Sequence, residues 1–385
     1  MELNAHSPLG ASGAARWMAC PGSVGLSQGV DDPEDDTYSS VGTGAHNLAA
    51  QCLHAGDDTW SYVGTPAPET SLVVDKDMAD AVQVYLSYIR GCDRHISKSW
   101  IEQRFHCPKL HELFYGTADY AEYNSMGRTL LVLDYKHGAG IVVEAKDNPQ
   151  CLYYACAILE AQDLWDKVDD VTVGIIQPRG FHSDGPIRTW DITTLLLRKW
   201  LDNVLLPAMR RAMVSSETHS GEHCRFCPAR RRACPQLLQD MSELEVLMQE
   251  VKTGAAELTN EQVGRFLDLF DVAKIIGKAA NETAFARLNA GQAIPGRKLA
   301  NARANRTWKE DAEAALKKQF GRDAYNSELK SPAQIEKMPL GNEAASRWAF
   351  KPDVGLTVVK SGDSRIGVNT DVKSMFKDTT KKGKK

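Results

Sequence analysis

The middle of the chain reads Leu-Val-Leu-Asp-Tyr-Lys-His-Gly at residues 131–138, an apolar run that ends in an acidic-x-Lys pair. Aliphatic residues at this density predict a strand over residues 129–136. Because side chains alternate along a strand, Asp134 and Lys136 are expected to project from the same face. The stretch therefore predicts a strand that carries a carboxylate and an ammonium group side by side.

Similar segments lie on both sides of this strand. Clusters of β-branched, aromatic and aliphatic residues predict further strands at 100–107, 117–123, 171–177 and 187–192. Helical spacing and capping residues predict helices at 14–18, from Gly42 with Thr43 as N-cap, at 76–90, at 149–161 and at 194–214. The order of helices, a three-stranded meander, a helix, strands and a helix predicts an α/β sandwich around a mixed sheet.

The composition changes after Cys234 and predicts a second, helical part of the chain. Residues 236–290 have helical character with a capping box at Thr259–Gln262, and short helices are expected at 309–320 and 331–337. We therefore expect three regions: a first domain over residues 1–240, a helical accessory domain over 241–350, and a loosely ordered, Lys-rich tail over 351–385.

The bulk composition, with 43% hydrophobic and 25% charged residues, is that of a globular protein. No apolar run approaches the ~20 residues that a membrane span needs, and the first residues lack a signal-peptide pattern, so we expect a cytoplasmic protein without membrane association. The nine cysteines predict reduced thiols rather than a disulfide framework. A net charge of −4 does not exclude DNA, because local basic clusters occur at Arg230–Arg232 and Lys381–Lys385.

Two carboxylates are expected to lie on adjacent strands of the meander. Gly-Thr-Ala-Asp at residues 116–119 precedes the central strand, so Asp119 and Asp134 are placed close enough to share a divalent cation. Mg²⁺ and Mn²⁺ take oxygen ligands of this kind. Lys136 beside such an ion would orient water or stabilise charge on a phosphodiester under attack. The competing interpretation is a surface ion pair, because short acidic-x-Lys matches are common by chance.

Three further residues belong to the candidate site. Gln150 and Tyr154 are four residues apart, so a helix presents both on one face, where they could hydrogen-bond to a phosphate backbone. His46 would add an imidazole ligand that favours Mn²⁺. The competing interpretations are an ordinary helix face for the pair and a structural role for the histidine.

Two other charged pairs rank lower. Glu102 and Arg104 on the preceding strand are interpreted as members of a cross-strand ion pair that could assist the site. Glu144 and Lys146 repeat the acidic-x-Lys pattern after a glycine-containing turn and rank second to the pair at 134–136.

Four cysteines have spacing that suggests one metal centre. Cys224 and Cys227 form a C-x2-C turn, Cys234 follows closely, and Cys20 lies far away at the start of the chain. Four thiolates can hold Zn²⁺, which is the commoner occupant of such sites, or an iron–sulfur cluster. Either centre would fasten the two ends of the first domain together. The other five cysteines are interpreted as core thiols: Cys52, Cys92, Cys107, Cys151 and Cys156.

These motifs together resemble the RecB-like branch of the PD-(D/E)xK nuclease superfamily. The resemblance rests on His46, the Gly-Thr-Ala-Asp segment, Asp134–Gly138 and the Gln-x-x-x-Tyr pair, and it spans roughly residues 6–236. The cysteine arrangement resembles the iron–sulfur subgroup of that branch, and the chain as a whole is similar to a group of phage and prophage proteins with this core.

The resemblance implies a role for each of these positions. His46, Asp119 and Asp134 would bind Mg²⁺ or Mn²⁺ together with the backbone carbonyl of Tyr135, and Lys136 would be the catalytic lysine. Gln150 and Tyr154 would position the DNA strand. The four cysteines would hold a [4Fe–4S] cluster, with structural Zn²⁺ as the alternative: Cys20, Cys224, Cys227 and Cys234.

The expected function is therefore that of a metal-dependent DNA nuclease with a restriction-endonuclease-like core. We expect an exonuclease that acts on single-stranded DNA or duplex ends during phage or prophage DNA recombination or processing in a bacterial cytoplasm. Arg230 and Arg231 would contact the nucleic acid, and a recombination protein or helicase would be a partner. The alternatives are a nuclease-like module that binds DNA or a partner without cleavage, and a zinc-stapled scaffold.

Overall fold

The computed structural model describes residues 6–30, 36–91, 95–231, 234–253, 258–303, 306–309, 311–325, 329–336, 338, 340–352, 355–360 and 365–368. The backbone divides into two compact units, Met1–Ile276 and Gly277–Lys385. Each unit has a hydrophobic core of its own.

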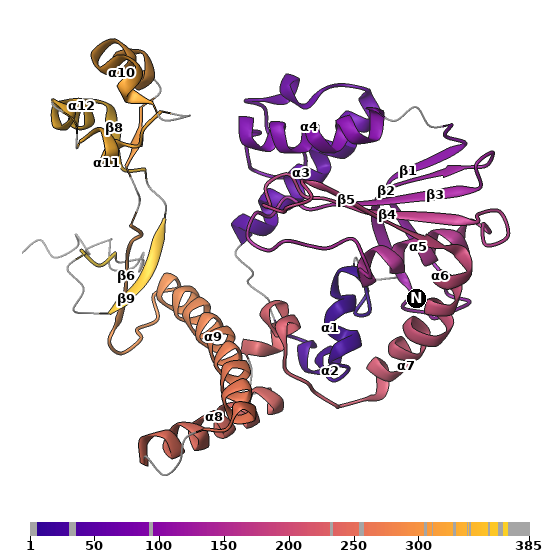
Figure 1. Ribbon diagram of the computed structural model, residues 1–385. Coiled ribbons are helices and arrows are strands. Elements are labelled where there is room, and N and C mark those ends of the chain that lie inside the picture. The colour runs from indigo at the N-terminus through magenta and orange to yellow at the C-terminus, as the bar shows by residue number, and fades with distance from the viewer. Residues whose placement is uncertain are drawn as a thin grey trace, which may run out of the picture. The chain divides into compact units, whose positions relative to one another are not determined.

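The first unit is built on a five-stranded mixed sheet in the order β1-β2-β3-β4-β5 (Figure 1). Its strands are β1 (Lys98–His106), β2 (Tyr115–Asn124), β3 (Thr129–Tyr135), β4 (Asp170–Ile176) and β5 (Ile187–Thr193). Neighbouring strands pair antiparallel except β3 and β4, which run parallel and are connected through helix α5 (Pro149–Ala161). The predicted meander and the mixed sheet are confirmed.

Helices cover both faces of this sheet (Figure 1). Helices α3 (Asp36–Ala55) and α4 (Lys76–Gly91) pack on one face, and α5, α6 (Thr194–Trp200) and α7 (Leu206–Val214) pack on the other. The shorter elements are η1 (Ala11–Gly13), α1 (Ala14–Ala19), α2 (Ser23–Ser27), η2 (Thr59–Tyr62), η4 (Glu222–Phe226), η5 (Pro228–Arg231) and the π-helical segment η3 (Leu201–Leu205) between α6 and α7. The predicted α/β architecture, a mixed sheet flanked by helices, is confirmed.

Strand β3 is buried on both faces, which explains its continuous apolar run. Leu130 and Val132 pack into the core beneath α5, whereas Leu131, Leu133 and Tyr135 pack into the core beneath α3 and α4. The alternation of side chains along the strand therefore divides one apolar sequence between two cores. By the same alternation, position 134 faces the α5 side.

Helix α5 begins where the sequence predicts it. The side chain of Asn148 accepts hydrogen bonds from the backbone N–H groups of Gln150 and Cys151, and Pro149 occupies the first turn. An Asn cap followed by Pro satisfies the free N–H groups of the first turn and presets the helical backbone. This start fixes which residues of α5 face the sheet.

Helix α3 starts earlier than predicted. It begins at Asp36, so Thr43, the expected N-cap, lies inside the helix. Val41 packs against the core beneath α3 and α4, and this burial extends the helix through the Gly-rich segment that the sequence suggested as its start. Tertiary packing here outweighs the weak helix propensity of glycine.

The second unit contains strands that the sequence did not predict. The predicted domain boundary at residue 240 lies inside α8 (Pro235–Thr253), and the two units meet within α9 (Asn260–Asn289), whose predicted capping box at Thr259 and Gln262 is confirmed. The remaining elements are β6 (Arg297–Asn301), β7 (Thr307–Trp308), α10 (Ala312–Phe320), η6 (Gly321–Ala324), α11 (Pro332–Ile335), α12 (Gly341–Trp348), β8 (Ala349–Phe350) and β9 (Leu356–Lys360).

Two antiparallel strand pairs form in this unit, β6 with β9 and β7 with β8. Strand β9 lies in the region expected to be loosely ordered. Of that predicted tail, residues 369–385 lie outside the described part of the chain.

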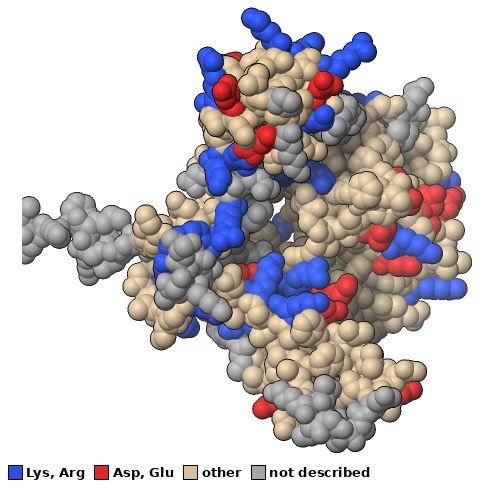
Figure 2. All heavy atoms as spheres, turned by 60° about the vertical axis from the view of Figure 1, so that its left-hand side comes forward, with Lys and Arg blue, Asp and Glu red and all other residues tan. Residues whose placement is uncertain are grey.

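No helix in the described ranges is both long enough and apolar enough to cross a membrane. On the face shown in Figure 2, basic and acidic side chains are interspersed with uncharged residues. The net charges of the two units, counted from the sequence, nevertheless have opposite signs.

Candidate active site

Three carboxylates occupy neighbouring positions on three adjacent strands. Glu102 of β1 lies opposite Asp119 of β2, which lies next to Asp134 of β3. The strand register establishes this row through the flanking pairs Ile101↔Tyr120, Gln103↔Ala118 and Tyr120↔Leu133. The antiparallel meander thus brings together acidic residues that are far apart in the sequence.

Helix α3 adds His46 to this row. Its Nδ1 atom lies 3.2 Å from Oε1 of Glu102 and 3.6 Å from Oδ2 of Asp119. One donor atom from each of these three residues falls within 4.8 Å of the other two. The side chains of His46 and Glu102 are each 30% exposed, so the group can be reached from solvent. An imidazole with two carboxylates fits a divalent cation such as Mn²⁺ or Mg²⁺.

The electrostatics of the group also favour a bound cation. Burial, together with the nearby charges of Asp134 and Glu102, raises the pKa of Asp119 to about 7, although His46 and Lys136 oppose this shift. Burial lowers the pKa of His46, but Asp119 and Glu102 outweigh it and raise that pKa to about 9. Carboxylates crowded in this way repel one another, and a cation relieves the repulsion.

Asp134, which the resemblance implies as a metal ligand, lies outside the group of His46, Glu102 and Asp119 and contacts Lys136 and Gln150 instead, so its role as a ligand stays a prediction. Its Oδ2 atom lies 2.9 Å from Nζ of Lys136, and its Oδ1 atom accepts a hydrogen bond of 2.7 Å from Nε2 of Gln150. The Lys136 ammonium in turn donates to Oε1 of Gln150 at 2.9 Å. Burial lowers the pKa of Lys136, but Asp134 and Asp119 outweigh it and raise that pKa, so the lysine stays protonated.

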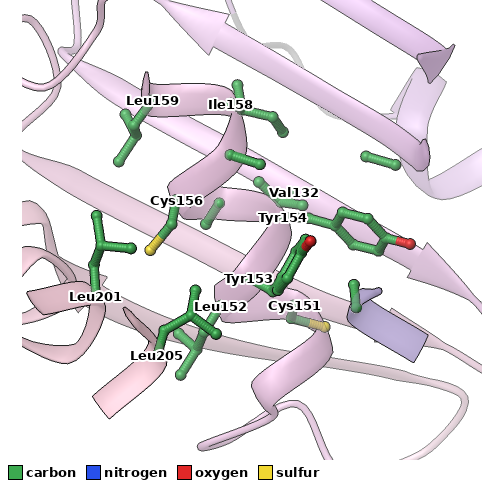
Figure 3. Close-up of a cluster of buried hydrophobic side chains, with 14 of the residues drawn as sticks. Val132, Cys151, Leu152, Tyr153, Tyr154, Cys156, Ile158, Leu159, Leu201 and Leu205 are labelled. Atoms are coloured by element: carbon green, nitrogen blue, oxygen red, sulfur yellow. The ribbon is translucent and has the colours of Figure 1, made fainter. Parts of the chain in front are cut away.

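Tyr154 completes the predicted constellation from one turn farther along α5. In Figure 3 the ring of Tyr154 and the side chain of Leu152 lie on opposite sides of the helix, and Leu152 is the one that lies near Leu205. The ring lies against Gly116, where an added Cβ atom would come within 3.1 Å of Cε1 of Tyr154. Burial, with the charges of Asp119 and Asp134, raises the pKa of Tyr154 well above its usual value, so the hydroxyl remains a hydrogen-bond donor.

The structure therefore brings together all the predicted catalytic residues, and it adds one that the sequence ranked lower. Glu102 pairs with His46 instead of forming the expected cross-strand ion pair. Its backbone has φ of +44° in the middle of a strand, a left-handed conformation that non-glycine residues rarely adopt. The sequence showed only that an acidic residue lies in the strand next to Asp119. The backbone conformation that directs the Glu102 carboxylate to His46 was not predictable from the sequence.

The backbone of Tyr135 contacts the candidate site through its N–H group, whereas the prediction concerned its carbonyl group. Its N–H group donates a hydrogen bond of 2.7 Å to Oδ2 of Asp119 and so holds that carboxylate in place. Its ring packs in the core beneath α3 and α4, 5.2 Å from the ring of Tyr85. The role of its carbonyl as a metal ligand stays a prediction.

The second acidic-x-Lys pair has separate contacts. Glu144 pairs with His182 at 3.0 Å, and Lys146 is exposed. The main candidate site is therefore the one at 134–136.

The four cysteines singled out in the sequence converge on one pocket. All four are buried and line the same cavity together with His219 and His223: Cys20, Cys224, Cys227 and Cys234. Burial, with the neighbouring thiols, raises the pKa of Cys224 to about 11. Among the described residues, no three of these sulfurs lie within 4.8 Å of one another.

Close backbone contacts join the two ends of the chain segment that carries these cysteines. The N–H group of Gly22 donates a hydrogen bond of 2.7 Å to the carbonyl of Glu217, and His219 N–H approaches Sγ of Cys20 at 3.4 Å. A Cβ atom at position 22 would lie only 2.8 Å from the carbonyl oxygens of Ser216 and Glu217. Gly22 is therefore required for this close approach.

A comparison with protein families gives a match over most of the chain. The model of a family described as "Protein of unknown function (DUF2800)" matches residues 6–371. The chain belongs to this family. The match covers the residues of the candidate active site, the cysteine pocket and the four described strands of the second unit.

One predicted DNA contact of this DUF2800 chain is buried. Arg230 is 7% exposed and lines the cysteine pocket, so its side chain is not presented to solvent as a phosphate contact requires. The sequence placed it on the surface because three consecutive arginines usually form a solvated basic cluster. Arg231 is partly exposed, and its proposed contact with nucleic acid stays a prediction.

Proposed function

We propose that this DUF2800 protein is a metal-dependent DNA nuclease, an exonuclease that hydrolyses phosphodiester bonds on a PD-(D/E)xK-like core. The observation that supports the proposal is the convergence of two groups across three adjacent strands. One group is His46 with Glu102 and Asp119, and the other is Lys136 with Asp134 and Gln150. Metal-assisted hydrolysis of a phosphodiester uses a cation site, and a nearby positive donor can stabilise the negative charge that develops.

The first group would hold the cation. Its nitrogen and carboxylate donors suit Mn²⁺ and, less selectively, Mg²⁺. A divalent cation bound there supplies positive charge that stabilises the phosphodiester oxygens as the bond is cleaved. The hydrogen bond from the Tyr135 N–H group holds the Asp119 carboxylate toward this position.

The second group would act on the phosphate and the attacking water. Asp134 and Gln150 hold the Lys136 ammonium in a fixed, largely buried position, so its charge is available without reorganisation when negative charge develops. The protonated hydroxyl of Tyr154 and the amide of Gln150 are donors of the kind that bind phosphate oxygens. These contacts would position the strand without reading its sequence.

The pocket lined by Cys20, Cys224, Cys227 and Cys234 would hold a structural [4Fe–4S] cluster, with structural Zn²⁺ as the alternative occupant. A zinc ion bound by four thiolates at about 2.3 Å brings each pair of sulfurs to about 3.8 Å. In a four-iron cluster each thiolate binds a different iron, so the sulfurs stand farther apart. Iron and zinc analysis of anaerobically purified protein distinguishes the two.

Digestion of end-labelled linear DNA tests the proposal. We expect shortening of single- or double-stranded DNA with Mn²⁺ or Mg²⁺ and none with EDTA, because the carboxylate group needs a cation. Release of label from an end identifies an exonuclease, whereas internal fragments identify an endonuclease. Metal-loaded protein that binds DNA but leaves it intact would contradict the nuclease and favour a binding module.

A further inference from the structure

The two units of the chain carry opposite net charges. Residues 1–276 contain 24 Lys and Arg against 38 Asp and Glu, a formal charge of −14. Residues 277–385 contain 22 Lys and Arg against 12 Asp and Glu, a formal charge of +10. The overall charge of −4 conceals this division. The unit with the candidate active site is therefore acidic, and the smaller unit is strongly basic.

The basic character belongs to the described residues of the second unit as well as to the Lys-rich end of the sequence. Its described residues include 15 Lys and Arg but 6 Asp and Glu. Ion pairs join Lys278 to Glu282 and Arg306 to Glu336. These pairs neutralise a minor part of the positive charge.

One basic group lies at the end of helix α10. Lys317, Lys318 and Arg322 are exposed, and none has a carboxylate partner among the residues that the structure describes. On their other side, α10 packs through Ala312 and Leu316 into the small core of this unit. The group is therefore presented to solvent from a supported helix.

We propose that the second unit, Gly277–Lys385, captures DNA through its phosphate backbone and supplies most of the binding affinity of the chain. The choice of DNA as the partner rests on the proposed function. Lys and Arg that contact phosphates release counterions, which gives sequence-independent binding with a steep salt dependence. The net negative charge of the first unit opposes the approach of the same backbone, and a basic unit on the same chain would offset that repulsion.

Binding of fluorescently labelled DNA in EDTA, over a series of salt concentrations, tests this with the full chain. The variant combines Lys317→Glu, Lys318→Glu and Arg322→Glu. We expect its affinity to fall at least about tenfold at low salt, and its salt slope to decrease by about 2 to 3, because three phosphate contacts are lost. If charge reversal impairs folding, the same positions are changed to Gln, and a smaller loss in the same direction is expected.

A matched control changes the same number of exposed basic residues in the first unit: Lys109→Glu, Lys199→Glu and Arg210→Glu. We expect it to weaken binding less than about threefold. An equal loss in the control, or unchanged binding in the α10 variant, would overturn the proposal. Displacement of DNA by polyglutamate as effectively as by unlabelled DNA would also overturn it, in favour of an acidic protein partner.

This readout is independent of cleavage. Wild-type protein that binds DNA in EDTA through the second unit, yet fails to hydrolyse it with Mn²⁺, would count against the proposed nuclease and not against this inference.

Discussion

Glu102 is the residue that most changes the candidate site from the one expected. A left-handed backbone costs a non-glycine residue about 1 to 2 kcal/mol. Such strain in the middle of β1 persists because the surrounding sheet fixes it, and it directs the carboxylate to His46 and the Asp119 side of the site. This placement is the reason that the proposed function includes Glu102 in the cation site.

Glu102→Gln tests that role. The amide keeps the size of the side chain but removes one negative charge from the donor set. We expect the affinity for Mn²⁺ to fall by at least about tenfold while the fold is retained, as measured by isothermal titration calorimetry and circular dichroism. The matched control is Glu112→Gln, at an exposed carboxylate outside the group. Mn²⁺ binding by the Glu102 variant equal to that of wild type would remove Glu102 from the site.

At the scale of elements, the sequence predicted most of the first unit. Alternation and apolar runs located the five strands, and Asn148 with Pro149 fixed the start of α5, because these signals are local. The row of carboxylates followed from the meander, since antiparallel neighbours bring Asp119 beside Asp134. What was not predictable depends on contacts between distant segments: the early start of α3, the strand β9 and the burial of Arg230.

The contact of Gly22 with Ser216 and Glu217 tests whether the close approach of these two distant segments stabilises the first unit. Gly22→Ala places a methyl group against two carbonyl oxygens, so we expect a loss of about 1 to 3 kcal/mol in the free energy of unfolding, measured by urea denaturation. Gly25→Ala, inside the helix α2 that Gly22 precedes, meets no atom within 4 Å and serves as the control, with a neutral or slightly stabilising effect expected. Equal stability of the two variants would show that this close approach does not support the fold.

At the scale of the whole molecule, the opposite charges of the two units agree with the proposal that the second unit binds DNA and the first unit hydrolyses it. The acidic first unit contains the candidate cation site and the buried cysteine pocket, whereas the second unit has a net positive charge and carries the exposed basic group of α10. The sequence alone contained this asymmetry, and the asymmetry is larger when the boundary between the units lies within α9 rather than at residue 240. On this account, binding and hydrolysis can be separated by mutation.

The most direct test of the central claim compares Lys136→Gln with Lys146→Gln in the metal-dependent digestion of end-labelled DNA. Both changes remove one lysine from an acidic-x-Lys pair, but only Lys136 lies beside Asp134 and Gln150. We expect Lys136→Gln to lower the rate by at least about a hundredfold, with folding, Mn²⁺ binding and DNA binding retained, and Lys146→Gln to leave it unchanged. Digestion by the Lys136 variant at the wild-type rate would contradict the account.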